Sequence, residues 1–107
     1  MNYELEPSIR ERCLRAFLDL AILRMLTQNP LTAYEMNTNL VKKFSVMIAP
    51  STIYKTLSDM KEKALIKCTR KRNRRIYILT EHGQEIVKNM NVIIEEVHRF
   101  AKVLLGS

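Results

Sequence analysis

Hydrophobic side chains recur at spacings of three and four residues along most of the chain, which is the pattern of one buried helix face. The first such stripe follows an S-x-x-E capping box formed by Ser8 and Glu11. Since Asn29 and Pro30 terminate a helix readily, we predict a first helix from near Ile9 to Asn29. Its apolar stripe consists of Leu14, Phe17, Leu18, Ala21, Ile22, Met25 and Leu26.

Two shorter helices are expected next. Thr32 and Glu35 repeat the capping-box pattern ahead of a second apolar stripe, which predicts a helix over residues 32–43. Pro50 suits the first turn of a third helix, because its missing amide hydrogen would be unpaired there in any case. The stripe of this helix, predicted over residues 50–63, consists of Ile53, Leu57, Met60 and Ala64.

The pattern then changes from helical to extended. Residues 65–69 and 76–79 are β-branched and apolar, and Asn73 between them tolerates a left-handed turn, so we predict a two-stranded hairpin. Thr80 then caps a last helix over residues 81–105.

The last predicted helix carries a heptad seam, which predicts contact with a second chain. The seam, our candidate dimer interface, consists of Ile86, Met90, Ile93, Val97, Phe100 and Leu104. The alternative interpretation is that this face covers only the domain's own core. Parallel and antiparallel pairing of the seam both remain open.

This order of elements is that of a winged helix-turn-helix. We therefore expect a mainly α fold with a small β-hairpin, in which residues 1–80 form the winged helix-turn-helix domain. Residues 81–107 would form a C-terminal dimerisation helix.

The charge of the chain is concentrated in the hairpin region. The chain has 107 residues, enough for one compact domain, and a net charge of +7. Residues 61–80 contain eight basic side chains and one acidic one, so this segment supplies the whole excess. Such a patch favours an anionic partner, and the alternative is a solvated charged loop.

Basic and short polar side chains fall where this fold would contact double-stranded DNA. The outer face of the third helix offers Ser51, Thr52 and Lys55 to base edges or phosphates in a major groove. The hairpin would then be the wing, placed on phosphates or in the minor groove. The candidate wing contacts are Arg70, Lys71, Arg72, Arg74 and Arg75.

Three segments between Leu18 and Gly83 read LDLAILRMLTQNPLTAYEM, APSTIYKTLSDMKEKALI and RRIYILTEHG. These segments resemble the PadR family of transcriptional regulators. The most specific part resembles the family motif P-x-T-[LI]-Y-x-x-L, here Pro50, Thr52, Ile53, Tyr54 and Leu57, followed by Tyr77, Leu79, Thr80 and Gly83.

The resemblance implies a homodimeric DNA-binding regulator, usually a repressor, that dimerises through its C-terminal helix. It also implies that Tyr54 contacts DNA, although a ring partly buried against the second helix is the alternative. Some members sense small molecules at the dimer interface, and no residue here identifies such an effector. Two positions depart from the family pattern: Ala49 replaces a frequent capping Ser, and Ala64 replaces a Gly that commonly ends the recognition helix.

Other functional classes are less well supported by the sequence. We expect no enzyme, no cofactor and no metal site, because catalytic motifs are missing and Cys13, Cys68, His82 and His98 lack metal-ligand spacing. The two cysteines are expected to be buried thiols of a cytoplasmic, nucleoid-associated protein with no membrane segment. The remaining alternatives are a protein-interaction module, a sequence-tolerant chromosome-coating protein and an RNA-binding protein.

Overall fold

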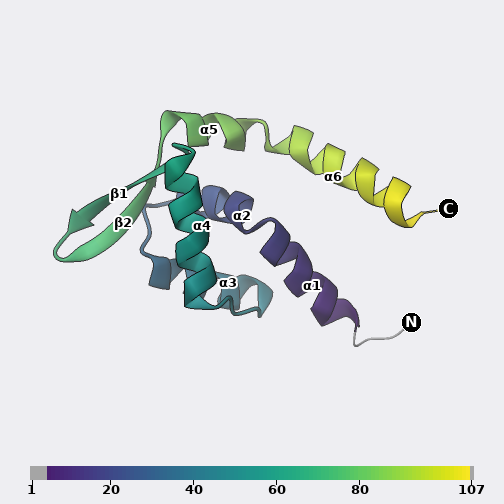
Figure 1. The fold of residues 1–107 in the computed structure, drawn as a ribbon, viewed down its shortest axis with the longest axis horizontal. Coiled ribbons are helices and arrows are strands. Elements are labelled where there is room, and N and C mark those ends of the chain that lie inside the picture. Colours follow the sequence, from purple (N-terminus) through teal and green to yellow (C-terminus); the bar gives the residue numbers. More distant parts are fainter. Residues whose placement is uncertain (1–4, 107) are drawn as a thin grey trace.

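The computed structural model describes residues 5–106, and it confirms a mainly α fold with one small hairpin. The hairpin extends from one side of the molecule, and the first and last helices extend from the other side (Figure 1). The elements are α1 (Leu5–Ala16), α2 (Leu18–Leu26), α3 (Ala33–Phe44), α4 (Pro50–Glu62), β1 (Ile66–Lys71), β2 (Arg74–Leu79), α5 (Glu81–Lys88) and α6 (Met90–Leu105).

The core lies between α2, α3, α4 and the base of the hairpin. Most of its fully buried side chains, including Ile22, Met36 and Ile53, lie on the predicted apolar stripes, whereas Leu23 and Ile48 were not predicted. Asn37 fixes the turn between α3 and α4: its side-chain amide donates to the carbonyl of Ile48 at 2.9 Å, and the Ile48 amide donates back at 3.3 Å. This turn sets the orientation of α4, whose predicted range of residues 50–63 agrees closely with the observed Pro50–Glu62.

The predicted first helix is two helices. The chain breaks at Phe17, whose φ of −115° and ψ of 26° are not helical. Helix α1 begins at Leu5, so Ser8 lies inside it and the capping box predicted at Ser8 is wrong. Because α2 has four buried side chains whereas Leu14 is the one buried residue of the described part of α1, core packing fixes only the second segment.

The predicted last helix is also broken. Asn89 separates α5 from α6 with φ −97° and ψ 14°, and its side-chain amide donates to the carbonyl of Glu85 at 3.1 Å. Helix α5 packs on the core through Ile86 and Val87, whereas no side chain of α6 is buried. The heptad seam is therefore divided, with Ile86 on α5 and its other members on α6.

The hairpin pairs in one antiparallel register, from Ile66 opposite Leu79 to Lys71 opposite Arg74. Its two turn residues, Arg72 and Asn73, have φ of 53° and 64°, as a type I′ turn requires. The strands extend further toward the tip than the apolar residues predicted, because backbone pairing continues through the basic residues.

A backbone bridge joins the hairpin to the start of α3. The amide of Tyr77 donates to the carbonyl of Leu31 at 2.8 Å, and the amide of Leu31 donates to the carbonyl of Tyr77 at 3.2 Å. Strand β2 therefore has partners on both sides, which fixes the base of the hairpin against the helix-turn-helix.

Ala64 adopts a left-handed conformation with φ 59°, as expected where a Gly usually stands. An L-residue there has a strain of about 1–2 kcal/mol that Gly avoids, although Gly loses more chain entropy on folding. We expect Ala64→Gly to raise the free energy of unfolding by about 0.5–1 kcal/mol, measured by urea denaturation. The control is Ala21→Gly within α2, which should lower stability by about 1 kcal/mol. An equal decrease in the free energy of unfolding of both variants would contradict the strain assigned to Ala64.

Candidate nucleic-acid interface

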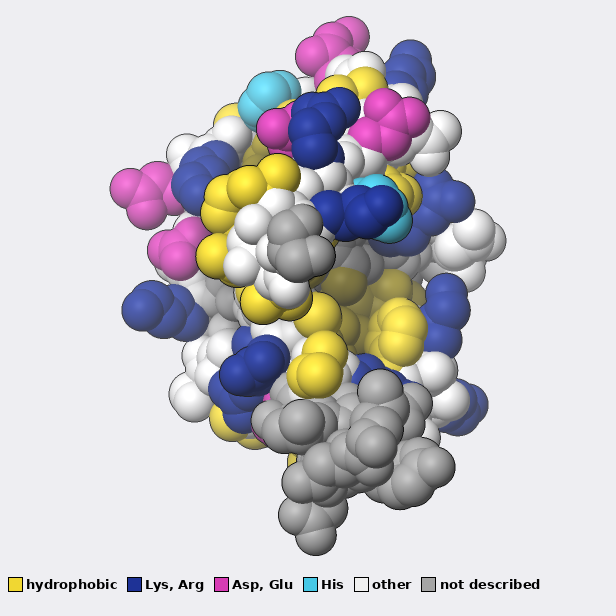
Figure 2. Space-filling model, turned by 90° about the vertical axis from the view of Figure 1, so that its right-hand side faces the viewer, with side chains coloured by type: hydrophobic (Ala, Val, Ile, Leu, Met, Phe, Trp, Pro, Cys, Tyr) yellow, Lys and Arg dark blue, Asp and Glu magenta, His cyan; other side chains and the backbone are white. Residues whose placement is uncertain are grey.

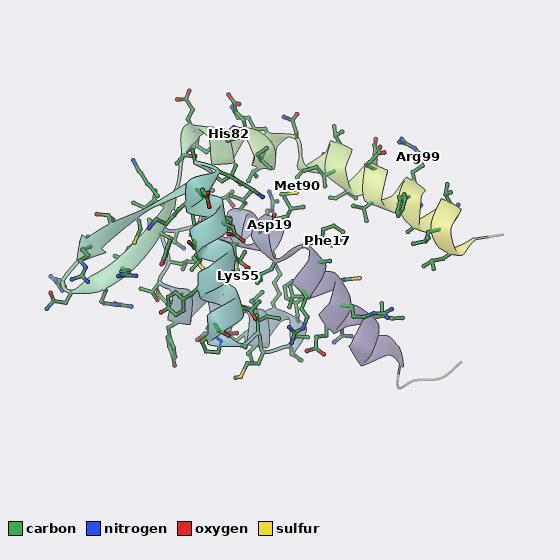
Figure 3. The ribbon with its side chains drawn as sticks, viewed as in Figure 1. Phe17, Asp19, Lys55, His82, Met90 and Arg99 are labelled. Atoms are coloured by element: carbon green, nitrogen blue, oxygen red, sulfur yellow. The ribbon has the colours of Figure 1, made fainter. Side chains whose placement is uncertain are left out.

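Helix α4 presents one face to the core and the opposite face to solvent. Ile53, Leu57 and Met60 are buried, which fixes the rotation of the helix about its axis. The outer face of α4, meaning Ser51, Thr52, Tyr54 and Lys55, contains three exposed residues and the half-buried Thr52. Figure 3 labels the exposed Lys55 on α4. The N-cap Ala49 makes no side-chain hydrogen bond, as its identity predicted.

The five basic residues predicted for the wing are all exposed on the hairpin. Like charges lie directly opposite each other in two cross-strand pairs, Arg70 with Arg75 and Lys71 with Arg74. Such pairs are destabilising unless an anion lies nearby. Among the described residues, Arg74 is the one wing cation with an ion pair, at 3.8 Å from Glu35. The wing therefore presents a largely uncompensated positive charge.

Glu35 connects the base of the wing to the start of α3. Its carboxylate accepts the Thr32 amide at 2.9 Å, and its own amide donates to the Thr32 hydroxyl at 3.2 Å, so the predicted capping box is confirmed. Hydrogen bonds from the Thr32 amide and the Thr32 side chain to the carboxylate, more than the charge of Arg74, hold the pKa of Glu35 below its ordinary value. The carboxylate is therefore ionised at neutral pH and able to position Arg74.

A cleft of about 400 Å³ separates α4 from the wing, and we call it the tyrosine–arginine cleft. It is lined by Thr32, Ala33, Tyr34, Tyr54, Arg74, Arg75 and Tyr77. Tyr54 is 52% exposed at its rim and also lies beside Ala33 and Asn37 of α3, so both a ligand contact and a ring partly buried against α3 stay open. Burial, followed by the nearby Cys68, raises the pKa of Tyr77, and Arg75 opposes the shift.

Tyr34 is a surface residue that the sequence analysis missed. It is 80% exposed, close to the wing and Tyr54. The available signal was a polar aromatic residue lying off the apolar stripe of its helix.

A second exposed surface lies on α6, on the side of the molecule opposite the hairpin. Three predicted seam residues, Val97, Phe100 and Leu104, are 37%, 64% and 64% exposed. The remaining three, Ile86, Met90 and Ile93, are half-buried. Of the six seam residues, Ile86 alone packs on the core. The alternative interpretation, that the seam covers only the core of its own domain, therefore explains one of the six.

The exposed seam borders an apolar groove between α1 and α2 on one side and α5 and α6 on the other. Hydrophobic side chains gather on this side of the molecule (Figure 2). The groove has a volume of about 640 Å³, and Phe17, Ile93 and Val97 contribute to its lining.

Other sequence expectations have mixed outcomes. Cys13 is exposed and Cys68 half-buried, so the prediction of two buried thiols is wrong; α1 contributes too little to the core to cover its cysteine. Within residues 5–106, no group of three potential metal ligands comes together. None of the helices in this range has the length and hydropathy needed to cross a bilayer.

The sequence pattern of the family described as "Transcriptional regulator PadR-like family" matches residues 22–89, which run from the middle of α2 through α3, α4 and the hairpin to the end of α5. The chain belongs to this PadR-like family. The match confirms the resemblance recognised in the sequence. None of the curated proteins matches the chain significantly.

Solved structures of transcriptional regulators have the same fold. A PadR-like transcriptional regulator from Bacillus cereus is 26% identical, with a TM-score of 0.73 over 90% of this chain and 98% of that one. A transcriptional regulator from Clostridium thermocellum is 21% identical, with a TM-score of 0.75 over 88% and 95%. The family and these neighbours are transcriptional regulators rather than enzymes.

Proposed function

We propose that this PadR-like regulator is a homodimer that binds double-stranded DNA sequence-specifically and represses transcription. The outer face of α4 would enter the major groove while the wing contacts phosphates or the minor groove. The observation that carries the proposal is the exposed, largely unpaired positive charge of the wing beside α4. Bacillus subtilis PadR, 20% identical with a TM-score of 0.58 over 70% of this chain and 46% of that one, has been solved with operator DNA.

Fluorescence anisotropy with genomic duplex fragments over a salt series tests DNA binding. We expect log affinity to fall linearly with log salt, by about 0.9 per phosphate contact. Sequencing of the tightest fragments should then reveal a shared inverted repeat. Binding without a shared sequence would favour a chromosome-coating protein, and tighter binding to RNA would favour the RNA alternative. No binding at low salt would contradict the proposal and direct attention to protein partners.

The proposed dimer uses residues 81–107, with α6 providing most of the contact. The exposed seam on α6 supports this assignment, because isolated soluble domains rarely leave such a continuous apolar face in water. Dimer symmetry would place two recognition helices about 34 Å apart, matching one turn of DNA. A stable monomer in sedimentation at micromolar concentration would remove the basis for an inverted-repeat site.

Removal of one wing charge should weaken binding to every duplex by a similar factor. Arg72→Asn is suitable because Asn tolerates the left-handed conformation at this position. We expect the salt slope to decrease by about 0.9, since one phosphate contact is lost. Lys55→Ala on the outer face of α4 should instead change the sequence preference. An unchanged affinity and salt slope for Arg72→Asn would contradict the wing assignment.

Repression is the finer part of the proposal. A dimer bound across an inverted repeat within a promoter would exclude polymerase by steric overlap. In vitro transcription from a promoter that carries the selected site should therefore decrease as protein is added. Increased transcription would identify an activator instead.

A small-molecule effector is supported by the apolar groove beside α6. Bacillus subtilis PadR has also been solved with p-coumaric acid. In this chain the groove volume of about 640 Å³ lies in the range of ligand sites, and Arg24 and Lys88 add positive charge to the lining. Aromatic carboxylates that bind here should shift the melting temperature and release DNA. Release without a melting shift would contradict binding at this groove.

A further inference from the structure

The tyrosine–arginine cleft brings Tyr34, which belongs to none of the proposed contacts, together with contacts proposed for α4 and the wing. Three elements bring them together: α3 contributes Tyr34, α4 contributes Tyr54, and β2 contributes Arg74 and Arg75. The two exposed tyrosines also border a smaller pocket between α3 and α4. The phenols and guanidiniums therefore converge from separate parts of the fold on one space.

The chemistry of the cleft matches an anion that accepts hydrogen bonds. Guanidinium groups only donate, and phenol and threonine hydroxyls can donate. No carboxylate is found among the described residues that line the cleft. The adjacent Glu35 does not line it, and its carboxylate already accepts the Thr32 amide and pairs with Arg74. A phosphodiester, with one negative charge and two acceptor oxygens, fits this arrangement.

The position of the cleft indicates which phosphodiester it would take. If α4 occupies a major groove and the wing reaches the adjacent minor groove, the sugar–phosphate backbone that separates the grooves passes between them. The cleft lies at this place, between α4 and β2. We infer that the cleft binds one backbone phosphate of the duplex, with Tyr34 and Tyr54 donating hydrogen bonds and Arg75 supplying charge. The inference rests on the proposed function and adds Tyr34 to its contacts.

The walls of the cleft are held in place before any ligand arrives. The bridge between Leu31 and Tyr77 fixes β2 to the start of α3, and the Glu35 ion pair positions Arg74. Ile53 anchors the turn of α4 that carries Tyr54. A fixed arrangement of donors lowers the entropic cost of binding.

Tyr34→Phe tests the site because it removes a hydroxyl and leaves the ring. The residue is 80% exposed, so the fold should be unaffected. We expect about ten-fold weaker binding to specific and non-specific duplexes alike, because the lost hydrogen bond reads no base. The control, Asn39→Ala, changes an exposed residue of α3 outside the cleft and should leave the affinity unchanged.

Duplexes with a single neutral methylphosphonate identify the phosphate. For the wild-type protein, one substitution between the two grooves should weaken binding. For Tyr34→Phe, the same substitution should have a much smaller effect, while substitutions elsewhere keep theirs. If the effects of Tyr34→Phe and of the methylphosphonate on the binding free energy add at every backbone position, the inference is overturned and DNA binding itself is not. No binding of the wild-type protein to any duplex would overturn the proposed function as well.

A titration of the free protein with inorganic phosphate separates the two sources of this ligand chemistry. The cleft would be assigned to a free anion by two results together. Millimolar phosphate would change the NMR chemical shifts of the Tyr34 and Tyr54 rings, and Tyr34→Phe would leave the effect of every methylphosphonate substitution unchanged. These results would overturn the assignment to DNA. A methylphosphonate effect at one duplex position that Tyr34→Phe reduces supports the assignment to DNA, whether or not free phosphate also binds.

Discussion

Phe100→Glu should convert the proposed homodimer to a folded monomer. Phe100 is 64% exposed on α6, a helix that buries no side chain in its own protomer, so the substitution removes no core contact. A carboxylate in an apolar interface costs about 2 kcal/mol per copy. Because a two-fold dimer contains two copies, its dissociation constant should rise about 1,000-fold.

Sedimentation velocity over a concentration series measures this change, and circular dichroism establishes that the protomer remains folded. Affinity for a selected inverted repeat should fall together with dimerisation, since a monomer contacts one half-site. Lys102→Glu is the control, because it places a carboxylate on the polar side of the same helix. A dimer that survives Phe100→Glu would contradict the assignment of the seam.

Gly83→Ala should destabilise the domain strongly. Gly83 is buried in the first turn of α5, and a Cβ atom there would lie 2.2 Å from the backbone carbonyl oxygen of Leu65. The same carbonyl accepts the Thr80 amide at 3.1 Å, and the Thr80 hydroxyl caps α5 by accepting the Gly83 amide at 3.0 Å. Relief of the clash therefore requires α5 to move away from the start of β1.

We expect Gly83→Ala to lower the free energy of unfolding by about 3 kcal/mol, the upper part of the range for overpacking. For a domain of this size, such a loss lowers the melting temperature by about 12–24 °C. Gln84→Ala is the control, since the neighbouring side chain is exposed on the same helix. A melting temperature within a few degrees of the wild type would show that α5 adjusts without cost.

The sequence predicted the helix-turn-helix and the hairpin because their patterns arise from local contacts. Caps at Thr32 and Thr80, Pro50 and the apolar stripes set these elements directly, and the structure retains them. The breaks at Phe17 and Asn89 were not predicted because the apolar pattern continues across both. Each break lies where the chain leaves the core, and this depends on tertiary packing that no local pattern records.

The charged part of the candidate site was equally accessible from the sequence. The basic run of residues 61–80 is a local feature, and all five of its predicted wing contacts are exposed. The tyrosine–arginine cleft was not accessible, because it depends on the pairing of Leu31 with Tyr77. This bridge brings the wing beside Tyr34, which lies more than thirty residues away in sequence.

In the proposed DNA complex, the bridge between Leu31 and Tyr77 would separate two properties of the operator. The bridge joins the wing and the helix-turn-helix into one DNA-contacting unit, whose side chains would decide the half-site sequence. The proposed dimerisation helix α6 joins this unit through α5 and one non-helical residue, Asn89. In the proposed dimer, the backbone angles at this joint would decide how far apart the two DNA-contacting units lie, and hence the spacing of the half-sites. Substitutions at this joint would then change the spacing of the two half-sites without changing the base sequence that each unit contacts.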